Sequence, residues 1–173
     1  MLLTNGNIKT KSKILQYHFY FSKDKKLEND EYINFLITYH KTIENDEFAE
    51  YIKIEKYLHD STVKIFNKNK SIIIEFNYWK NDENRVCTGE LEFLDATLMS
   101  WNKVIKSGHI SRLNKNITPC EYGYDEFYKH NNEKYVTIIF FTKDKNQRVN
   151  TGIYYPMLTI KYKWIKVNEE KNV

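Results

Sequence analysis

The stretch SIIIEFNYWK-NDEN-RVCTGELEFL, residues 71–94, decides the fold, because two alternating segments flank a polar turn. Pairing Lys80 with Arg85 makes it an antiparallel hairpin with one almost wholly apolar face. A slip of one residue would turn that face to solvent, so the hydrophobic pattern specifies the register. The facing pairs on the apolar side are Ile72 with Phe93, Ile74 with Leu91, Phe76 with Gly89, and Tyr78 with Cys87.

The second face of this hairpin carries three glutamates in the same register. The facing pairs there are Glu75 with Glu90, Ile73 with Glu92, Asn77 with Thr88, and Trp79 with Val86. Like charges that face each other across a sheet are unfavourable, so another strand must supply counter-charge. Lys161 and Lys163 lie on the polar side of a later alternating segment and are the predicted source.

The composition indicates a folded, strand-rich protein. The chain has 173 residues, most simply one domain over 1–173, with 41% hydrophobic residues, 14 Tyr and 10 Phe. Formal net charge is only +4. Glycine and proline number 5 and 2, and neither of the glycine-rich phosphate-binding motifs occurs. We therefore expect no nucleotide cofactor, and no cofactor of another kind is predicted.

Cysteine usage and hydropathy bear on the compartment. The two cysteines, Cys87 and Cys120, cannot form a disulfide framework, and Cys87 falls on the apolar face of the hairpin, where a buried thiol is expected. The first residues lack a hydrophobic signal core, and no apolar run approaches the roughly 18 residues of a membrane span. These features predict a soluble, cytoplasmic protein.

Four further segments have the pattern of strands. They are Ile14–Phe21, Thr62–Asn67, Tyr135–Thr142 and Met157–Val167, of which Thr62–Asn67 is either a short strand or an extended entry to the hairpin. The run YVTIIFFT at 135–142 is apolar throughout, which is typical of a central strand buried on both faces. In the last segment alternation places Tyr162 and Trp164 on the inward side.

Helical spacing of apolar residues occurs elsewhere in the chain. It predicts a helix at 31–43 and a second helix that begins at Asp95, with Asp95 as N-cap and Gly108 just after its C-terminus. Residues 47–58 fit a helix or a strand, with the helix favoured, and 124–129 fit one short helix. The predicted fold is therefore α+β: a mainly antiparallel sheet of about five strands with two or three helices packed on one face.

The carboxylate face of the hairpin is the first candidate site. Glu75, Glu90 and Glu92 lie beside the outward Trp79, and exposed aromatic residues are enriched at binding hot spots. These four residues are predicted to contact a protein partner. The alternative is a hydrolase in which Glu75 and Glu90 act as facing carboxylates, with or without a metal.

The second candidate site lies in residues 109–134, where little periodicity is visible. A long irregular segment in a compact domain is often functional, and this one contains EYGYDEFYKH, residues 121–130. Aromatic and acidic side chains on a loop could recognise a basic protein. The predicted contact residues are Glu121, Tyr122, Tyr124, Asp125 and Tyr128.

Metal, thiol and nucleic-acid chemistry are less well supported by the sequence. No H-E-x-x-H or C-x-x-C motif occurs, so no metal site is predicted. Cys120 could act as a nucleophile only if His109 or His130 approached it in space. Lysine clusters such as KNK (68–70) and KYKWIK (161–166) suit single-stranded nucleic acid, but acidic residues interrupt most clusters, which makes that partner less favoured.

No motif ties the chain to a named family. In size and in its lack of cofactor motifs it is similar to small proteins that bind and neutralise another protein, such as immunity proteins of bacterial toxin systems or phage-encoded inhibitors. The leading prediction is a non-enzymatic binding or inhibitor protein. Its two acidic-aromatic surfaces would engage a basic partner, such as a toxin or effector domain.

Overall fold

The computed structural model describes part of the chain, and all structural statements below concern that part. The backbone is described for residues 3–5, 8–10, 51, 54, 57–80, 83–105, 110–112, 121–141, 148–149 and 152–169. Side chains are described for residues 51, 54, 57–80, 83–102, 121–127, 131–141 and 155–168.

The described residues are almost entirely strands, and every strand pair is antiparallel. β1 and β2 form a small two-stranded sheet, and the other strands form one ten-stranded sheet in the order β12-β5-β4-β3-β8-β9-β11-β6-β7, with β10 beside β11. The strands are β1 (Leu3–Asn5), β2 (Ile8–Thr10), β3 (Thr62–Lys68), β4 (Ser71–Lys80), β5 (Arg85–Leu94), β6 (Thr97–Ile105), β7 (Ile110–Arg112), β8 (Glu121–His130), β9 (Glu133–Phe141), β10 (Arg148–Val149), β11 (Gly152–Tyr162) and β12 (Trp164–Glu169).

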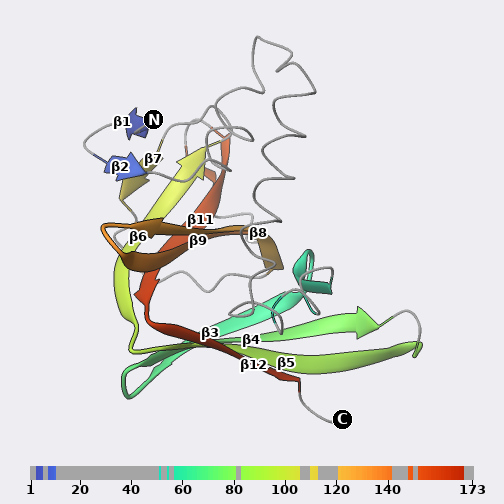
Figure 1. Ribbon diagram of the computed structural model, residues 1–173. Coiled ribbons are helices and arrows are strands. Elements are labelled where there is room, and N and C mark those ends of the chain that lie inside the picture. Colours follow the sequence, from blue (N-terminus) through green and yellow to red (C-terminus); the bar gives the residue numbers. More distant parts are fainter. Residues whose placement is uncertain are drawn as a thin grey trace, which may run out of the picture.

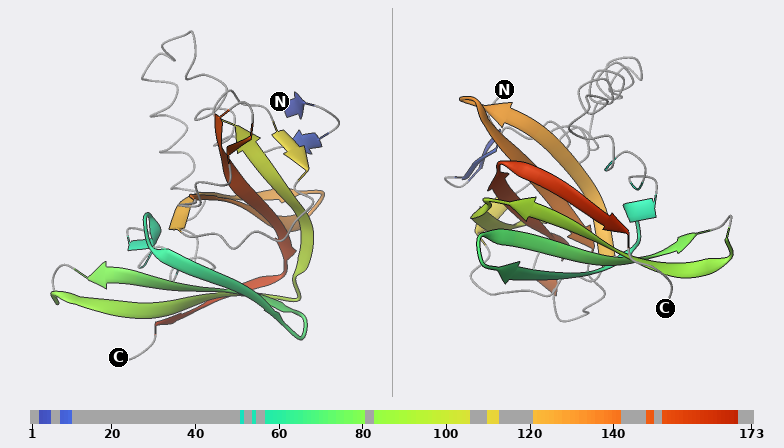
Figure 2. Two further views of the ribbon diagram at one scale, coloured as in Figure 1. Left: turned by 180° about the vertical axis from the view of Figure 1, so that it is seen from behind. Right: turned by 60° about the horizontal axis from the view of Figure 1, so that its bottom comes forward.

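The large sheet folds over on itself at two corners. β5 runs into β6 through Asp95 and Ala96, and β11 runs into β12 through Lys163. Since β5 pairs with β12 and β6 pairs with β11, the two corners lie side by side. They separate a hairpin layer (β3, β4, β5, β12), at the bottom of Figure 1, from a second layer (β6, β7, β8, β9, β11) above it. Figure 2 shows the same two layers from behind and from below.

Asparagine and aspartate make the tight turns in the described part of this glycine-poor chain. Its six non-glycine residues with positive φ are all Asn or Asp, the residue types that tolerate the left-handed region best. Asn69 and Asn84 stand in the turns that flank β4, Asp95 stands at the first corner, and Asn131 and Asn132 form the β8–β9 turn.

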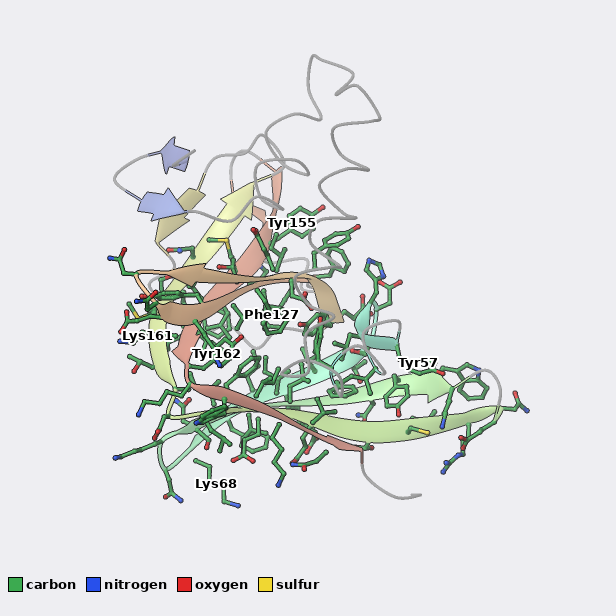
Figure 3. All side chains as sticks on the ribbon, viewed as in Figure 1. Tyr57, Lys68, Phe127, Tyr155, Lys161 and Tyr162 are labelled. Carbon is green, nitrogen blue, oxygen red and sulfur yellow. The ribbon has the colours of Figure 1, made fainter. Side chains whose placement is uncertain are left out.

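Aromatic side chains fill the space between the layers. The ring of Tyr162 lies 5.3 Å from Phe93 and 6.2 Å from Phe127, both in edge-to-face contact. Figure 3 shows Phe127 and Tyr162 between the layers, whereas Lys68 and Lys161 lie at the periphery. Such pairs contribute about 0.5–1.5 kcal/mol each beyond the burial of their area. The two layers are therefore held together by an aromatic core.

The structure confirms the predicted hairpin in every pair of its register. Ile72 faces Phe93, Phe76 faces Gly89 and Lys80 faces Arg85. Cys87 is a buried free thiol, as its place on the apolar face predicted. The strands predicted at 62–67 and 135–142 are confirmed as β3 and β9, and residues 136–140 of β9 are all buried.

The predicted α+β class is wrong, because the described part is mostly sheet and has no helix layer packed on a face. Residues 97–105, predicted as a helix, form β6, which pairs with β11 and β7. The spacing of the apolar residues Leu98, Trp101 and Ile105 is helical. However, β6 forms backbone hydrogen bonds with a strand on each side, and a local pattern of side chains cannot reveal such pairing with remote strands.

The other predicted helices have different outcomes. The helix predicted at 31–43 and the strand predicted at 14–21 lie outside the described residues. In the ambiguous segment 47–58, the described residues Tyr51, Ile54, Tyr57 and Leu58 have helical backbone. The short helix predicted at 124–129 is wrong, because these residues belong to β8.

A bulge explains why β8 was mistaken for an irregular segment. The register with β9 shifts between Tyr122 and Tyr124, so Gly123 is an extra residue in the strand. A Cβ atom on Gly123 would lie 2.7 Å from the carbonyl oxygen of Ile139, so only glycine fits there without movement. The bulge places Tyr122 and Phe127 on one face although their numbers differ by five.

The single strand predicted at 157–167 is also wrong, because the chain bends at Lys163. Before the bend, Leu158, Ile160 and Tyr162 point into the core, as predicted. After it the alternation is inverted: Ile165 and Val167 pack against the core, and Trp164 is 58% exposed. The predicted inward position of Trp164 is therefore incorrect.

Gly89→Ala should destabilise the protein. A Cβ atom at Gly89 would lie 2.5 Å from Cζ of Phe76, and both residues are buried, so the ring must move. We expect the free energy of unfolding to fall by about 1–3 kcal/mol, measured by urea denaturation. Val86→Ala, at an exposed position of the same strand, should stay within about 0.5 kcal/mol of wild type. Combining Gly89→Ala with Phe76→Leu should cost less than the sum of the single changes; simple additivity would refute the contact.

Candidate functional site

The outward side of the hairpin layer is the candidate site, and strand alternation determines its members. Directly facing residues of neighbouring strands share a face, so each row of the sheet can be read across β3, β4, β5 and β12. We call this surface the outer face. Its members are Thr62, Lys64, Phe66, Lys68, Ser71, Ile73, Glu75, Asn77, Trp79, Val86, Thr88, Glu90, Glu92, Leu94, Trp164, Lys166 and Asn168.

The counter-charge for the glutamates comes from the two flanking strands. Nζ of Lys64 on β3 lies 3.2 Å from Oε1 of Glu75, and Lys166 on β12 stands directly opposite Glu92. The predicted source was wrong. Lys161 pairs with Glu133 at 3.0 Å and Lys163 pairs with Asp95 at 3.3 Å, because the bend at Lys163 carries β11 into the other layer.

The carboxylate oxygens of Glu90 and Glu92 can accept further hydrogen bonds on this surface. Both are half-buried in the middle of the layer. Within the described part of the chain, no hydrogen bond or ion pair reaches either carboxylate. An ionised carboxylate has about four lone-pair sites, so a basic side chain approaching from outside would find acceptors there. The three glutamates outnumber Lys64 and Lys166, and the middle of the outer face is therefore acidic.

Large apolar side chains stand on the same face. Trp79 and Val86 face each other across the hairpin and are 51% and 55% exposed. Phe66 and Trp164 are also exposed and belong to the outer face. Four of the six exposed large hydrophobic residues in the described part thus lie on one side of one layer. Exposed apolar residues gathered in this way mark interaction surfaces.

The Trp79 end of the outer face is held in shape by its surroundings. Glu83 in the hairpin turn forms ion pairs with Lys80 and Arg85, and the hydrogen bonds from these residues lower the pKa of Glu83. Asn77 and Thr88 face each other in the row next to Trp79 and Val86, and Thr88 donates a hydrogen bond of 2.8 Å to Asn77. A cavity of about 290 Å³ lies beside Trp79 and is lined by Tyr57, His59, Asp60, Ser61, Asn77 and Tyr78. A partner side chain could enter this cavity next to the indole.

The second set of predicted residues lies elsewhere, on β8 in the second layer. Glu121, Tyr124 and Asp125 are half-buried, Tyr122 is buried, and the side chain of Tyr128 lies outside the described residues. The hydroxyl groups of Tyr51 and Tyr122 both donate to Oδ2 of Asp125, the latter at 2.6 Å. Tyr124 packs edge-on against the rings of His59 and Phe141. The structure therefore does not join the two predicted sets into one surface.

Sequence reasoning missed a cavity of about 650 Å³ at the two corners. Its lining includes Lys70, Lys134, Lys161, Lys163 and Trp164. These residues come from three separate parts of the chain, so no local motif could reveal them. The available signals were the lysine clusters KNK and KYKWIK, which the fold brings to the same corner.

The remaining chemistry of the described part is limited. Among the described residues, no group of three or more His, Cys, Asp or Glu could hold a metal ion. No helix in the described part has the length and apolar character needed to cross a membrane. Cys120, His109 and the side chain of His130 lie outside the described residues, so the predicted Cys/His alternative stays a prediction.

Comparisons with protein-family models, with curated proteins and with solved structures found no match for this chain. Function is therefore argued from the surface and its cavities alone.

Asp125→Asn should reduce stability, because Asp125 anchors two buried tyrosine hydroxyl groups. Removing the charge weakens both hydrogen bonds, and we expect the free energy of unfolding to fall by about 1–2 kcal/mol in thermal or urea denaturation. The matched control is Asp60→Asn, whose side chain is 69% exposed, and it should have little effect. Wild-type stability of Asp125→Asn would contradict the internal role of this carboxylate.

Proposed function

We propose that the protein binds a basic segment of another protein through the outer face and thereby blocks that partner. The supporting observation is that one layer presents the exposed pair Trp79–Val86 together with Glu90 and Glu92, whose carboxylates have no partner among the described residues. Apolar anchors and charged acceptors on a preformed sheet suit binding that requires little reorganisation.

The two parts of the surface have different tasks in this proposal. Trp79 and Val86 lie about 14 Å along the strands from the Glu75–Glu90 row, at roughly 3.4 Å per residue. The apolar pair provides the desolvated contact that holds the complex, and the cavity beside Trp79 accepts a side chain of the partner. The carboxylates attract basic residues during encounter and determine their position on the sheet.

An inhibitor or immunity protein is the form of this function that the sequence predicts. Such a protein acts by covering a functional surface of its partner, and it needs no catalytic group of its own. The basic partner, a toxin or effector domain, is inferred from the acidic middle of the outer face. We place this interaction in the cytoplasm, and the free, buried thiol of Cys87 is compatible with that reducing compartment.

The predicted hydrolase alternative gains no support from the geometry. Glu75, which would have to act with Glu90, is engaged by Lys64 at 3.2 Å. With its neighbours on the outer face it forms one row of the sheet, which has lysine and asparagine at its ends. No observation on this row favours acid–base catalysis over binding.

Photo-crosslinking in the native cell tests the proposal. A benzophenone amino acid at position 79 or 86 should give a discrete adduct with one basic protein, because these side chains are exposed at the proposed contact. Position 99 is the control, since Met99 is 49% exposed but lies on β6. Identical adducts from positions 79 and 99, or no adduct from positions 79 and 86, would argue against this surface.

Variants should then separate the two tasks with the purified partner. Trp79→Ala should weaken affinity by about 30-fold or more, as expected of a hot-spot residue, whereas Leu98→Ala should leave affinity unchanged. Glu90→Gln with Glu92→Gln should mainly slow association and reduce its dependence on salt. The partner's own activity should fall when wild type is added. An unchanged association rate would exclude the carboxylates from the interface.

A further inference from the structure

The corner cavity of about 650 Å³ gathers positive charge from distant parts of the chain. Lys70 comes from the β3–β4 turn, Lys134 from the start of β9, and Lys161 and Lys163 from the corner between β11 and β12. The two acidic residues in the lining are Asp95 and Glu133, so four lysines outnumber two carboxylates. The cavity therefore has a positive balance, opposite to the middle of the outer face.

The existing ion pairs leave the lysines able to take a further anionic partner. Lys161 and Lys163 each contact one carboxylate, at 3.0 and 3.3 Å, and their side chains are 35% and 71% exposed. Lys70 is also exposed, and Lys134 is half-buried. Exposed pairs of this kind contribute little to stability, and an ammonium group has three donors. A ligand phosphate can therefore bind these lysines without first breaking a strong interaction.

An aromatic ring stands at the edge of the same cavity. Trp164 is 58% exposed, and Nζ of Lys134 lies 4.8 Å from the centre of its ring. Lys134 also donates a hydrogen bond of 3.0 Å to the carbonyl oxygen of Lys163, which holds the ammonium group beside the indole. Because this ammonium group lies over the indole, a base whose phosphate lies among the lysines would stack on the ring face that Lys134 does not cover.

We propose that this cavity binds a nucleobase with its phosphate, either as a free nucleotide or as part of a single-stranded nucleic acid. Lys70, Lys161 and Lys163 contact the phosphate, and Trp164 stacks on the base. The site does not use a glycine-rich loop, in keeping with the lack of such motifs. Trp79 lies roughly 27 Å along the strand from the end of the layer where Trp164 stands, whereas Glu92 lies only about 7 Å from that end, so the cavity adjoins the carboxylate part of the proposed protein contact.

The test uses adenosine diphosphate and a ten-residue oligothymidylate as probes, each titrated into the full chain at low salt. Binding should quench tryptophan fluorescence, and the quenching should be lost in Trp164→Phe but kept in Trp79→Phe. Affinity should fall as salt rises. Tighter binding of the diphosphate identifies a free nucleotide as the source, and tighter binding of the oligonucleotide identifies a strand.

Paired charge variants separate a specific site from general attraction. Lys70→Gln with Lys161→Gln should weaken binding by about tenfold or more. Lys64→Gln with Lys68→Gln removes the same charge from β3, outside the cavity, and should change affinity less than about threefold. Glu133→Gln removes a negative charge from the cavity and should therefore increase affinity. This variant still tests the proposal if the lysine variant does not fold. Absence of binding by both probes, or equal loss in both lysine pairs, would overturn the proposal.

Discussion

The register of the β4–β5 hairpin is the constraint on which the rest of the structure depends. It turns Ile74, Phe76 and Leu91 into the core and keeps the glutamates outside. A shift by one residue would bury charge and expose the apolar set, and both changes are costly. β3 and β12 then pair with the outer edges of this hairpin. Because directly facing residues share a face, the orientation of the hairpin side chains also determines which side chains of β3 and β12 face outward. Gly89 is part of the same constraint, because only a residue without a side chain leaves room for the ring of Phe76.

The two corners convert this hairpin into a closed core. At Asp95 the chain leaves the hairpin layer for the second layer, and at Lys163 it returns to the hairpin layer, so the aromatic residues of both layers meet. The corner at Lys163 also inverts strand alternation, which turns Trp164 outward and Ile165 inward. Because the turns at both corners lie beside the β3–β4 and β8–β9 turns, lysines from unrelated segments gather there. The same bend therefore closes the core and creates the positive cavity.

Two surfaces of opposite charge follow from this arrangement. The middle of the outer face has more carboxylates than lysines, with exposed apolar residues at one end. The corner cavity has more lysines than carboxylates, with an indole at its edge. In the two proposals, the acidic surface would engage a basic protein segment and the positive cavity would engage a phosphate-bearing ligand.

The sequence by itself determined the hairpin register, the burial of Cys87, and the strands β3 and β9, because alternation within one segment is a local property of the chain. It also placed Glu75, Trp79, Glu90 and Glu92 on one face. Only the tertiary structure decided that residues 97–105 form a strand, because the pairing partners of β6 are remote in sequence. The bulge at Gly123 and the bend at Lys163 made two further strand patterns hard to recognise. After each of them, the set of alternate residues that points into the core is exchanged for the other set. The counter-charges and the corner cavity could not be predicted from local sequence patterns either, because they depend on which distant strands become neighbours.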